Sequence, residues 1–343
     1  ISCFEDKIVE LAVKRVLEPI YETVFEDSSS GYRLERNQHS CLDALGITIQ
    51  QKRISHAVEA DIQSFFEAVN HGWMITFLQH RTQDPRIIRL IWRMLKGGIL
   101  EDGLVKATEA GTPQGSILSP LLSNVYLHYV LDLWFSHTVR KQCRGEAYYF
   151  RFADDFLACF QYRGDANAFL QQLPERPNKF GLKPAAEKTR CIEFGRFARE
   201  SAHKRGEKPK EFTFLGFTHY CGKTKEGYFK VKRRTSRKKL GQSLRRFADW
   251  ARDARQRERK GEMLRQAKVR VIGHLNYYAI TDNSDQCHRY VYYATRLLFK
   301  WLNRKSQRKA YTWAGFAHAS EWVGWPKPSI RKDLNPCRRA EAY

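Results

Sequence analysis

Two adjacent aspartates, Asp154 and Asp155, stand in an otherwise aromatic and small apolar run, YYFRFADDFLACF (Tyr148 to Phe160). One interpretation is a tight turn between two strands, because aspartate is a common turn residue. The other is a metal site, because a buried carboxylate is costly unless it is paired, and two neighbouring carboxylates repel each other. A divalent cation would offset both costs. These residues alone leave the two interpretations open.

A third carboxylate extends the metal interpretation. In HAVEADIQSFF, Asp61 ends an apolar-leaning strand, and side-chain alternation places Asp61, Gln63 and Phe65 on one face. Mg²⁺ takes oxygen ligands, usually a few carboxylates with substrate phosphates and water, so three aspartates from two neighbouring strands would suffice. Two such ions lower the pKa of an attacking hydroxyl and stabilise the leaving oxygen in phosphoryl transfer. The pattern therefore predicts magnesium-dependent phosphoryl transfer.

The elements that must hold these aspartates can be outlined from periodicity. Residues Phe4 to Glu22 carry apolar residues at helical spacing, and acids stand where a helix begins. A Gly/Pro loop, AGTPQGSILSP, leads into a helix for which Ser119 is the expected N-cap and Pro120 the first residue. The segment Tyr148 to Phe160 is a candidate hairpin. Arg190 to Phe197 reads as a further strand.

The overall charge points to a polyanionic partner. The chain has 343 residues, 42% hydrophobic content and a net charge of +23, which favours nucleic acid first and an anionic membrane surface second. No apolar run approaches the length of a membrane-spanning helix, and no signal peptide is evident. Eight cysteines without a C-x-x-C pair indicate free thiols. We expect an intracellular protein.

The texture of the sequence changes after FTFLGFTHY (Phe212 to Tyr220). From Val231 to Arg270 the chain is strongly basic and reads as helical, and we place a domain boundary near residue 224. A charge run is often a solvated helix face. Because no acid stands between Lys232 and Arg246, a phosphate backbone is the competing partner. The candidate RNA-binding residues, including two beyond the run, are Arg233, Arg234, Arg237, Lys238, Arg245, Arg304 and Lys305.

Ordered blocks of the sequence carry a family resemblance. FADDF resembles the catalytic tetrad of reverse transcriptases, DIQSFF their first aspartate strand, and GTPQGSILSPLLSNVYL the PQG loop of the group II intron branch. In the same order, FEDKIVELAVKRVLEPIYE, SSGYRLER, GLKPAAEKTR, FTFLGF, VIGHLNYYAITDN and WLNRKSQRKAYTW are similar to blocks of group II intron reverse transcriptase/maturases. The resemblance covers nearly the whole chain.

This resemblance implies an α+β fold: a right-hand polymerase palm with part of the fingers, built on an antiparallel sheet with helices, in residues 1–224. An α-helical thumb/maturase domain would follow in residues 225–343. The implied activity is RNA-templated DNA synthesis with two Mg²⁺ ions, for which Mn²⁺ is a possible substitute, together with intron RNA binding for splicing. The implied partners are an RNA template, a DNA primer, dNTPs and group II intron RNA, in the bacterial cytoplasm and without a membrane. A homodimer is left open.

Two other functions are weighed against this one. An RNA-binding splicing cofactor could keep the palm as a catalytically impaired scaffold, and a nucleotide cyclase could use a similar palm. The intact set Asp61, Asp154 and Asp155 favours the polymerase. A cyclase would have no use for the PQG loop or the basic helices. Relatives carry a further fingers segment before the position of Ile1, so we expect the natural chain to be longer. No H-N-H nuclease motif follows Trp313, so DNA cleavage is not expected.

The resemblance also assigns roles residue by residue. Asp61, Asp154 and Asp155 would bind the metals, with Asp61 and Asp154 bridging them. Lys188 would lie near the triphosphate, where its ammonium neutralises or protonates the pyrophosphate leaving group. Arg33 would contact nucleotide or template from the fingers, with a surface salt bridge as the alternative.

The remaining assignments surround the nucleotide and the primer. Phe65 would be the gate against a ribonucleotide 2′-OH, with Phe66 as competitor and a core role as the alternative. Gln114 and Phe152, which stands where tyrosine is commoner, would lie beside the nucleotide. FLGF would grip the primer end through Phe214, Leu215 and Gly216.

Overall fold

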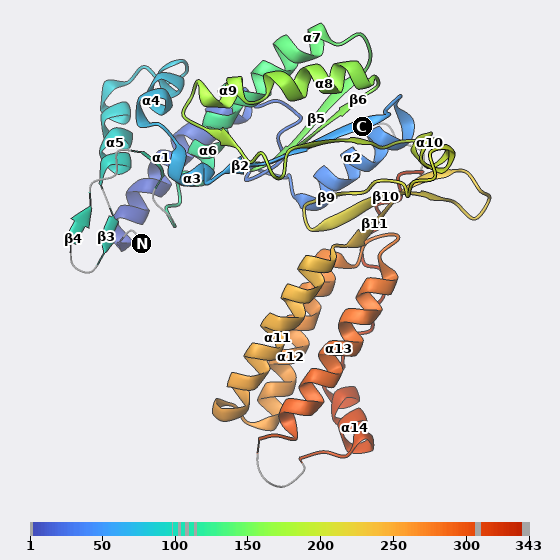
Figure 1. The fold of residues 1–343 in the computed structure, drawn as a ribbon. Helices are drawn as coiled ribbons and strands as arrows, with labels where there is room; N and C mark the ends of the chain where they lie inside the picture. Colours follow the sequence, from blue (N-terminus) through green and yellow to red (C-terminus); the bar gives the residue numbers. More distant parts are fainter. Residues whose placement is uncertain are drawn as a thin grey trace. The chain divides into compact units, whose positions relative to one another are not determined.

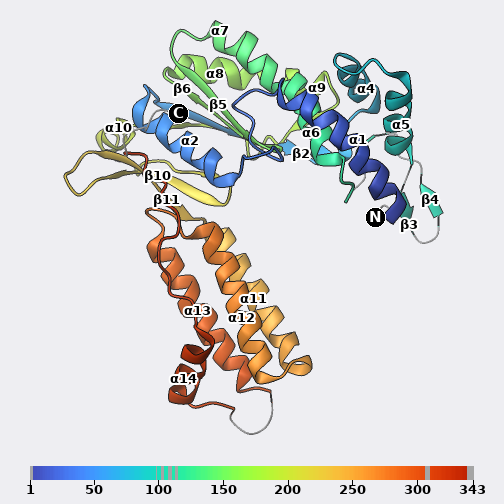
Figure 2. The ribbon, with the colours of Figure 1, turned by 180° about the vertical axis from the view of Figure 1, so that it is seen from behind.

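The computed structural model describes residues 3–97, 99–101, 104–106, 110–112, 115–305 and 310–337. The chain forms two compact units. The first comprises Ile1–Leu215 with Cys221–Val231, and the second comprises Gly216–Tyr220 with Lys232–Tyr343. Figures 1 and 2 show the first unit as strands with helices packed around them and the second as a bundle of helices.

A four-stranded sheet in the order β5-β6-β1-β8 is the centre of the first unit. β5 (Ala147–Phe152) and β6 (Asp155–Phe160) form an antiparallel hairpin, and β1 (His56–Ala60) lies antiparallel between β6 and β8 (Arg190–Glu193). From Phe156 to Phe160 every residue of β6 is buried, which explains why this strand reads as a continuous apolar run. The predicted hairpin is therefore present.

Helices surround this sheet and supply most of the core. α8 contacts β1, β6 and β8, whereas α2 contacts β5. The predicted first helix is present as α1. The helices of the unit are α1 (Phe4–Glu22), α2 (Gln38–Gln51), α3 (Phe65–Ala68), α4 (His71–Gln79), α5 (Pro85–Lys96), α6 (Ser119–Leu127), α7 (Arg140–Gln142), α8 (Arg163–Gln172), α9 (Glu175–Asn178) and α10 (Ala198–Lys204).

Two π-helical segments follow α6, where the sequence predicts one regular helix after the Gly/Pro loop. They are η1 (His128–Asp132) and η2 (Phe135–Val139). The helix does begin at Ser119, but Leu118 occupies the N-cap position and Ser119 is the first helical residue. π-Helical turns are rare and occur frequently at functional sites. Here η1 brings an aspartate into the interior of the unit, since Asp132 is 1% exposed.

Three small sheets complete the strands. β2 (Ile62–Gln63) pairs with β7 (Lys183–Pro184), and β3 (Ile99–Glu101) pairs with β4 (Leu104–Lys106). The third sheet has the order β11-β10-β9 and contains β9 (Phe212–Phe214), β10 (Phe217–Lys223) and β11 (Phe229–Thr235). The sequence predicts helix from Val231 onward. This is wrong for the first residues, because β11 continues to Thr235.

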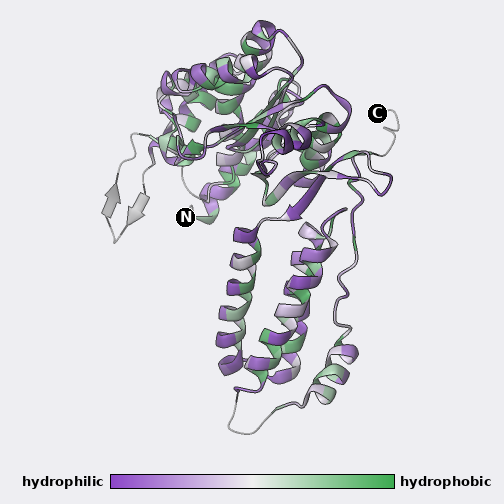
Figure 3. Ribbon diagram, turned by 45° about the vertical axis from the view of Figure 1, so that its right-hand side comes forward, coloured by the Kyte–Doolittle hydropathy of each residue, from purple (hydrophilic) through white to green (hydrophobic). Residues whose placement is uncertain are grey.

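The second unit consists largely of four helices: α11 (Arg237–Arg257), α12 (Lys260–Tyr278), α13 (Ser284–Leu302) and α14 (Trp313–Val323). The Ser236 hydroxyl caps α11 by accepting a hydrogen bond from the Lys239 N–H. The first three helices contact one another around buried residues such as Leu264, Val271 and Leu298. Figure 3 shows apolar and polar residues together on these helices. In the described part of the chain, no helix is long and apolar enough to cross a membrane.

Candidate active site

The two adjacent aspartates lie where the β5–β6 hairpin turns. Phe152 pairs with Asp155, so the turn consists of Ala153 and Asp154. Ala153 has a φ of +57°, a conformation that is uncommon for a residue other than glycine and that occurs at two-residue hairpin turns. Asp154 is partly buried and Asp155 is exposed. The pair therefore satisfies the turn interpretation and remains available for chemistry.

Asp61 lies beside this turn because of strand register. β1 ends at Ala60, which pairs with Phe156 just after the aspartates in β6. The backbone carbonyl of Asp61 accepts a hydrogen bond of 2.8 Å from the Ala185 N–H, next to the β2–β7 ladder. This ladder also brings Lys188 within reach, and its ammonium donates a hydrogen bond to the Asp61 carboxylate.

The pKa shifts show that these side chains interact electrostatically. Burial raises the pKa of Asp154, and the negative charge of Asp61 adds to this shift, whereas Lys188 and Arg151 oppose it. The hydrogen bond and charge of Asp61 raise the pKa of Lys188, and Asp155 contributes in the same direction. The predicted group Asp61, Asp154, Asp155 and Lys188 is thus brought together at one end of the sheet.

The donor set can be tested against the predicted Mg²⁺. Among the described residues, no set of three or more His, Cys, Asp or Glu side chains is grouped closely enough to hold an ion by itself. Mg²⁺ is commonly bound through one or two carboxylates together with substrate phosphates. The negative charge of Asp61 raises the pKa of Asp154, an effect that a divalent cation would relieve. These residues therefore fit a cation that binds together with a nucleotide, and the role of Asp155 stays a prediction.

An arginine that the sequence interpretation missed supports the turn from inside the unit. Arg151 is fully buried in β5, and its guanidinium forms two hydrogen bonds, of 2.7 and 2.6 Å, to the Asp132 carboxylate. A third nitrogen donates to the Ala153 carbonyl at 3.0 Å. The available signal was one arginine and one aspartate in two otherwise apolar runs, FRF and VLDLW. A buried charge is costly unless it is paired, so the arginine and the aspartate could have been predicted to form an ion pair.

The segment before α2 contacts the same turn through its backbone. The Ser30 N–H and the Ser28 carbonyl bond the backbone of Arg151 at 2.9 and 2.8 Å. Next to them, a side chain on Gly31 would put its Cβ 2.2 Å from the Ala153 nitrogen. The neighbouring Tyr32 is half exposed, and its pKa is raised by partial burial and by the charge of Asp154. The sequence interpretation did not single out Gly31 or Tyr32.

Arg33 does not have the predicted nucleotide-facing role. Its side chain is buried and pairs with Glu22 at 3.0 Å. It also donates to the carbonyls of Glu26 and Ser29 at 2.8 and 3.0 Å. The alternative, a salt bridge, is therefore correct, although the arginine side of the bridge is buried and only Glu22 is partly exposed. The guanidinium has no free edge for a nucleotide because its donors are engaged inside the unit.

Phe65 also lies in the core, where it is 2% exposed. Its ring contacts Phe66 and Tyr126 edge to face, at centroid distances of 5.3 and 6.4 Å. Phe66 is only partly buried, and its carbonyl accepts a hydrogen bond from the Thr112 N–H in the Gly/Pro loop. The gate assignment to Phe65 is thus corrected to a core role, and Phe66 remains as the gate candidate. Gln114 lies outside the described residues.

The structure describes Phe152 and the three residues of the predicted primer grip, but the roles assigned to them stay predictions. Phe152 is partly buried at the end of β5. Leu215 and Gly216 form a two-residue turn between β9 and β10, with φ values of +48° and +81°. Two positive φ values in succession are typical of a type I′ hairpin. Phe214 is buried, which leaves the turn residues as the more accessible part of the predicted primer grip.

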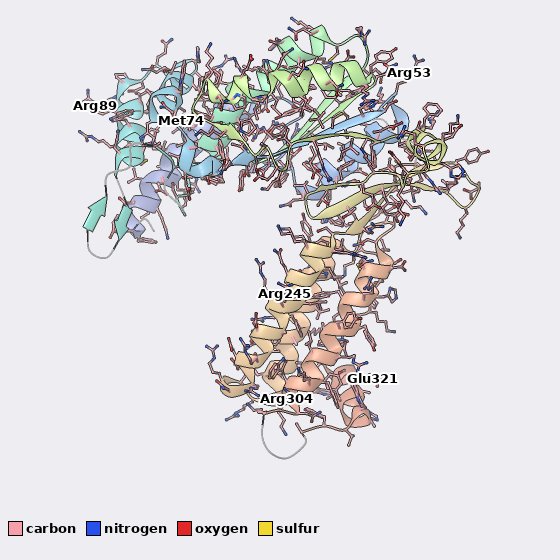
Figure 4. The ribbon with its side chains drawn as sticks, in the orientation of Figure 1. Arg53, Met74, Arg89, Arg245, Arg304 and Glu321 are labelled. Atoms are coloured by element: carbon pink, nitrogen blue, oxygen red, sulfur yellow. The ribbon has the colours of Figure 1, made fainter. Side chains whose placement is uncertain are left out.

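The basic residues of the second unit divide into exposed and engaged groups. Arg233 is fully buried and donates to the Leu334 carbonyl, so its predicted contact with RNA is wrong. Lys305 donates to the Arg255 and Glu258 carbonyls at the end of α11, and Arg304 lies 5.7 Å from the Trp301 ring. Figure 4 labels Arg245 and Arg304 on this unit.

The other candidates are more open to solvent. Arg234 stacks on Tyr220 at 5.0 Å and is partly exposed. Arg237, Lys238 and Arg245 are exposed along α11. These four and Arg304 remain available for the predicted RNA contacts.

Comparisons with known proteins place this geometry in a family. A family model described as reverse transcriptase (RNA-dependent DNA polymerase) matches residues 1–219. The chain is 41% identical over 137 residues to the group II intron-encoded protein LtrA of Lactococcus lactis subsp. cremoris, a match covering 39% of this chain and 22% of that protein. It is 32% identical over 185 residues to the protein YkfC of Escherichia coli (strain K12), covering 46% and 49%. The matches span about half or less of these relatives' length.

The solved structures agree at the level of fold. Telomerase from Candida tropicalis superposes with a TM-score of 0.50 at 11% identity, and the match covers 91% of this chain and 52% of that one. The fold is thus a right-hand polymerase palm and fingers followed by an α-helical domain, as predicted. The resemblance to group II intron proteins is confirmed by the named relatives. With a family model matched across well over half of its length, the chain belongs to the reverse transcriptase (RNA-dependent DNA polymerase) family.

Proposed function

We propose that this chain catalyses RNA-templated DNA synthesis. The observation that carries the proposal is the meeting of Asp61 and Asp154 at one end of a polymerase-type sheet, with Lys188 bonded to Asp61. Two carboxylates from neighbouring strands and an exposed ammonium are a sufficient set for nucleotidyl transfer when the nucleotide brings its own phosphate oxygens. The substrates would be an RNA template, a DNA primer and dNTPs.

In the proposed reaction the primer 3′-oxygen attacks the α-phosphorus of a dNTP. A new O–P bond forms as the hydroxyl proton passes to water, the bond between the α-phosphorus and the oxygen that bridges it to the β-phosphorus breaks, and pyrophosphate leaves with that electron pair. Mg²⁺ or Mn²⁺ held by Asp61 and Asp154, with Asp155 as a third candidate, would lower the pKa of the attacking hydroxyl and stabilise the leaving oxygen. The hairpin turn and β1 hold these carboxylates in place for that purpose.

Lys188 suits the leaving-group side of the reaction. A lysine is protonated at neutral pH, and Asp61 raises the pKa of Lys188 further above its ordinary value. Its side chain is 60% exposed, so phosphate oxygens of a bound nucleotide can compete with Asp61 for it. Charge neutralisation or proton donation to pyrophosphate then follows from the same group.

The helical unit supplies the second part of the proposal, which is RNA binding. Arg237, Lys238 and Arg245 are exposed on α11, and cations in this arrangement suit a phosphate backbone. The similarity to a protein named as group II intron-encoded supports intron RNA as a partner and a maturase role beside DNA synthesis. We assign residues 1–224 to palm and partial fingers and residues 225–343 to the thumb/maturase domain. The bacterial cytoplasm is the proposed location.

Primer extension on an RNA template with Mg²⁺ and dNTPs tests the proposal. The wild-type chain is compared with Asp154→Ala and with Glu200→Gln, which alters an exposed carboxylate on α10 outside the site. We expect extension by wild type and Glu200→Gln and none by Asp154→Ala, with RNA binding retained in all three. If wild type binds RNA tightly but adds no nucleotide, the polymerase is rejected and the RNA-binding cofactor stands. A cyclic nucleotide product would instead indicate a cyclase.

A further inference from the structure

The stability of the unit does not by itself account for the buried ion pair between Arg151 and Asp132. Both side chains are withdrawn from solvent, and the guanidinium binds the carboxylate through two hydrogen bonds. Replacing a buried ion pair by well-packed apolar residues is often neutral or stabilising, so such a pair is weak evidence for a stabilising role. Its remaining contacts therefore indicate what the arginine does.

The third nitrogen of the guanidinium points to the hairpin turn. Nη1 of Arg151 donates to the Ala153 carbonyl at 3.0 Å and to the Asn124 side-chain oxygen at 2.9 Å. The Asn124 amide in turn donates to the Gly31 carbonyl at 2.5 Å. One planar group thus connects α6, η1 and the segment before α2 to the peptide that immediately precedes Asp154.

The turn needs this support because its backbone is strained. Ala153 has a positive φ, and residues held in sparsely populated regions persist only when their surroundings fix them. Gly31, in the segment before α2, leaves no room for a Cβ against the Ala153 nitrogen. The turn is therefore held by the hydrogen bond from Arg151 and by close backbone packing against Gly31.

We propose that Arg151 is a positioning residue for nucleotidyl transfer: its hydrogen bond to the Ala153 carbonyl sets the direction of the Asp154 carboxylate, while Asp132 and Asn124 hold the guanidinium in register. The inference rests on the proposed polymerase function for its catalytic meaning. Its structural part, that the guanidinium orders the turn, is measurable without turnover. A misplacement of about 1 Å at a reacting group costs about 100-fold in rate, so a single hydrogen bond here has a large effect.

The decisive variant is Arg151→Met/Asp132→Leu, which replaces the ion pair by apolar side chains of similar size and removes the bond to the turn. We expect the double variant to melt near the wild-type temperature and to bind a template–primer normally. Its kcat should fall by about 10- to 100-fold, while the KM for dNTP changes by no more than about two-fold. Hydrogen–deuterium exchange in the peptide spanning residues 150–156 should become faster.

Arg176→Met is the matched control. Arg176 also donates to two carbonyls of the π-helical segment, those of Tyr129 and Val130 at 2.9 Å, and has no bond to the turn. We expect wild-type kcat and wild-type exchange at residues 150–156. Arg151→Lys keeps the positive charge but loses the planar guanidinium that binds Asp132 through two nitrogens. It should restore part of the kcat relative to the double variant.

Two outcomes would overturn the inference. One is a folded double variant with wild-type kcat, and the other is exchange at residues 150–156 no faster than in Arg176→Met. If wild type itself extends no primer, the proposed function fails. The exchange comparison then decides alone whether Arg151 orders the turn.

Discussion

At the scale of single residues, the site depends on how each charge is compensated. Asp61 is paired with an exposed lysine that can leave, whereas the guanidinium groups of Arg33 and Arg151 are themselves buried, and only Asp132 among their carboxylate partners is fully withdrawn from solvent. Exposed ion pairs contribute little to stability, so they are easily exchanged for a ligand. This difference separates residues available for chemistry from residues that hold the structure.

Substituting Lys188 by methionine tests the leaving-group role. We expect kcat/KM for single-nucleotide addition to fall by about 100-fold or more, because general acid catalysis contributes in that range. The melting temperature should hardly change, since the side chain is largely exposed. Lys183→Met, an exposed lysine on the neighbouring β7, is the control and should keep wild-type kinetics. Equal kinetics in both variants would remove Lys188 from the mechanism.

The two adjacent phenylalanines should behave differently when each is replaced by alanine. Phe65→Ala should lose about 3 to 5 kcal/mol of unfolding free energy, because it empties a core position. Phe66→Ala should cost less and should increase incorporation of rNTP relative to dNTP. The measurement is a denaturation curve and a dNTP/rNTP competition for each variant. Unchanged discrimination in Phe66→Ala would exclude the gate role.

At the scale of elements, turns and π-helical segments carry the functional geometry. The β5–β6 turn is fixed from Gly31 on one side and from Arg151 on the other, and η1 supplies the carboxylate that neutralises Arg151. The same helical segment places His128 in the core beside Phe25 and Tyr129. The close packing at Gly31 and the burial of His128 each lead to a testable prediction.

Gly31→Ala should displace the turn. The new Cβ would lie 2.2 Å from the Ala153 nitrogen, a backbone atom that cannot yield without moving Asp154. We expect a loss of about 1 to 3 kcal/mol in stability and a clear fall in kcat. Gly195→Ala is the matched control, because its Cβ would lie 2.1 Å from the Ile54 carbonyl oxygen. Both should be destabilised, measured by urea unfolding, but only Gly31→Ala should lose kcat in proportion to folded protein.

His128 should make the first unit sensitive to acid. Burial lowers its pKa to about 4, and Arg151, Arg81 and Arg33 act in the same direction against Asp132. The unfolded chain binds a proton near its ordinary pKa of 6.5, so stability is full above pH 6.5 and is lost as the pH falls toward 4. His128→Phe keeps the aromatic packing and cannot take up the proton.

Urea unfolding between pH 7 and pH 5 tests this. Wild type should lose about 2 kcal/mol more than His128→Phe over this range. The exposed His203→Gln should follow wild type. Parallel curves for wild type and His128→Phe would show that His128 does not contribute.

At the scale of the whole molecule, the net charge of +23 acts on RNA in two ways. One is the field of the whole protein, which we call general, and the other is direct contact of individual cations with phosphates, which we call local. A general field attracts any polyanion, whereas contacts to phosphates release counterions one by one. The exposed cations of α11 are the candidates for the local part. The dependence of RNA affinity on salt separates the two.

A triple variant, Arg237→Ala/Lys238→Ala/Arg245→Ala, should weaken RNA binding. The slope of log K against log salt should become shallower by about 2, because each phosphate contact contributes about 0.7 to 0.9. Lys208→Ala/Lys210→Ala/Lys223→Ala removes the same charge from other exposed positions and should keep the wild-type slope. Identical slopes in the two variants would mean that only the general field matters.

The sequence by itself determined the candidate aspartates, the hairpin that carries two of them and the helix after the Gly/Pro loop. These features follow from local rules: two-residue alternation, turn chemistry and helix capping act over a few neighbouring residues. The family resemblance could also be recognised from the sequence, because each motif block is one contiguous segment. The same local rules also led to the helical second unit, since a long helical texture shows in any window of its sequence.

Only the tertiary structure decided which charged and aromatic side chains face solvent. Arg33, Arg233 and Phe65 looked available in sequence and are buried, because burial depends on what packs against a residue from elsewhere in the chain. The link from Arg151 to Asp132 spans 19 residues, and the contact of Gly31 with Ala153 joins two separate segments. No local pattern encodes such distant pairs. The sequence therefore identified the candidate carboxylates, and the packing of distant segments decided what holds them in place.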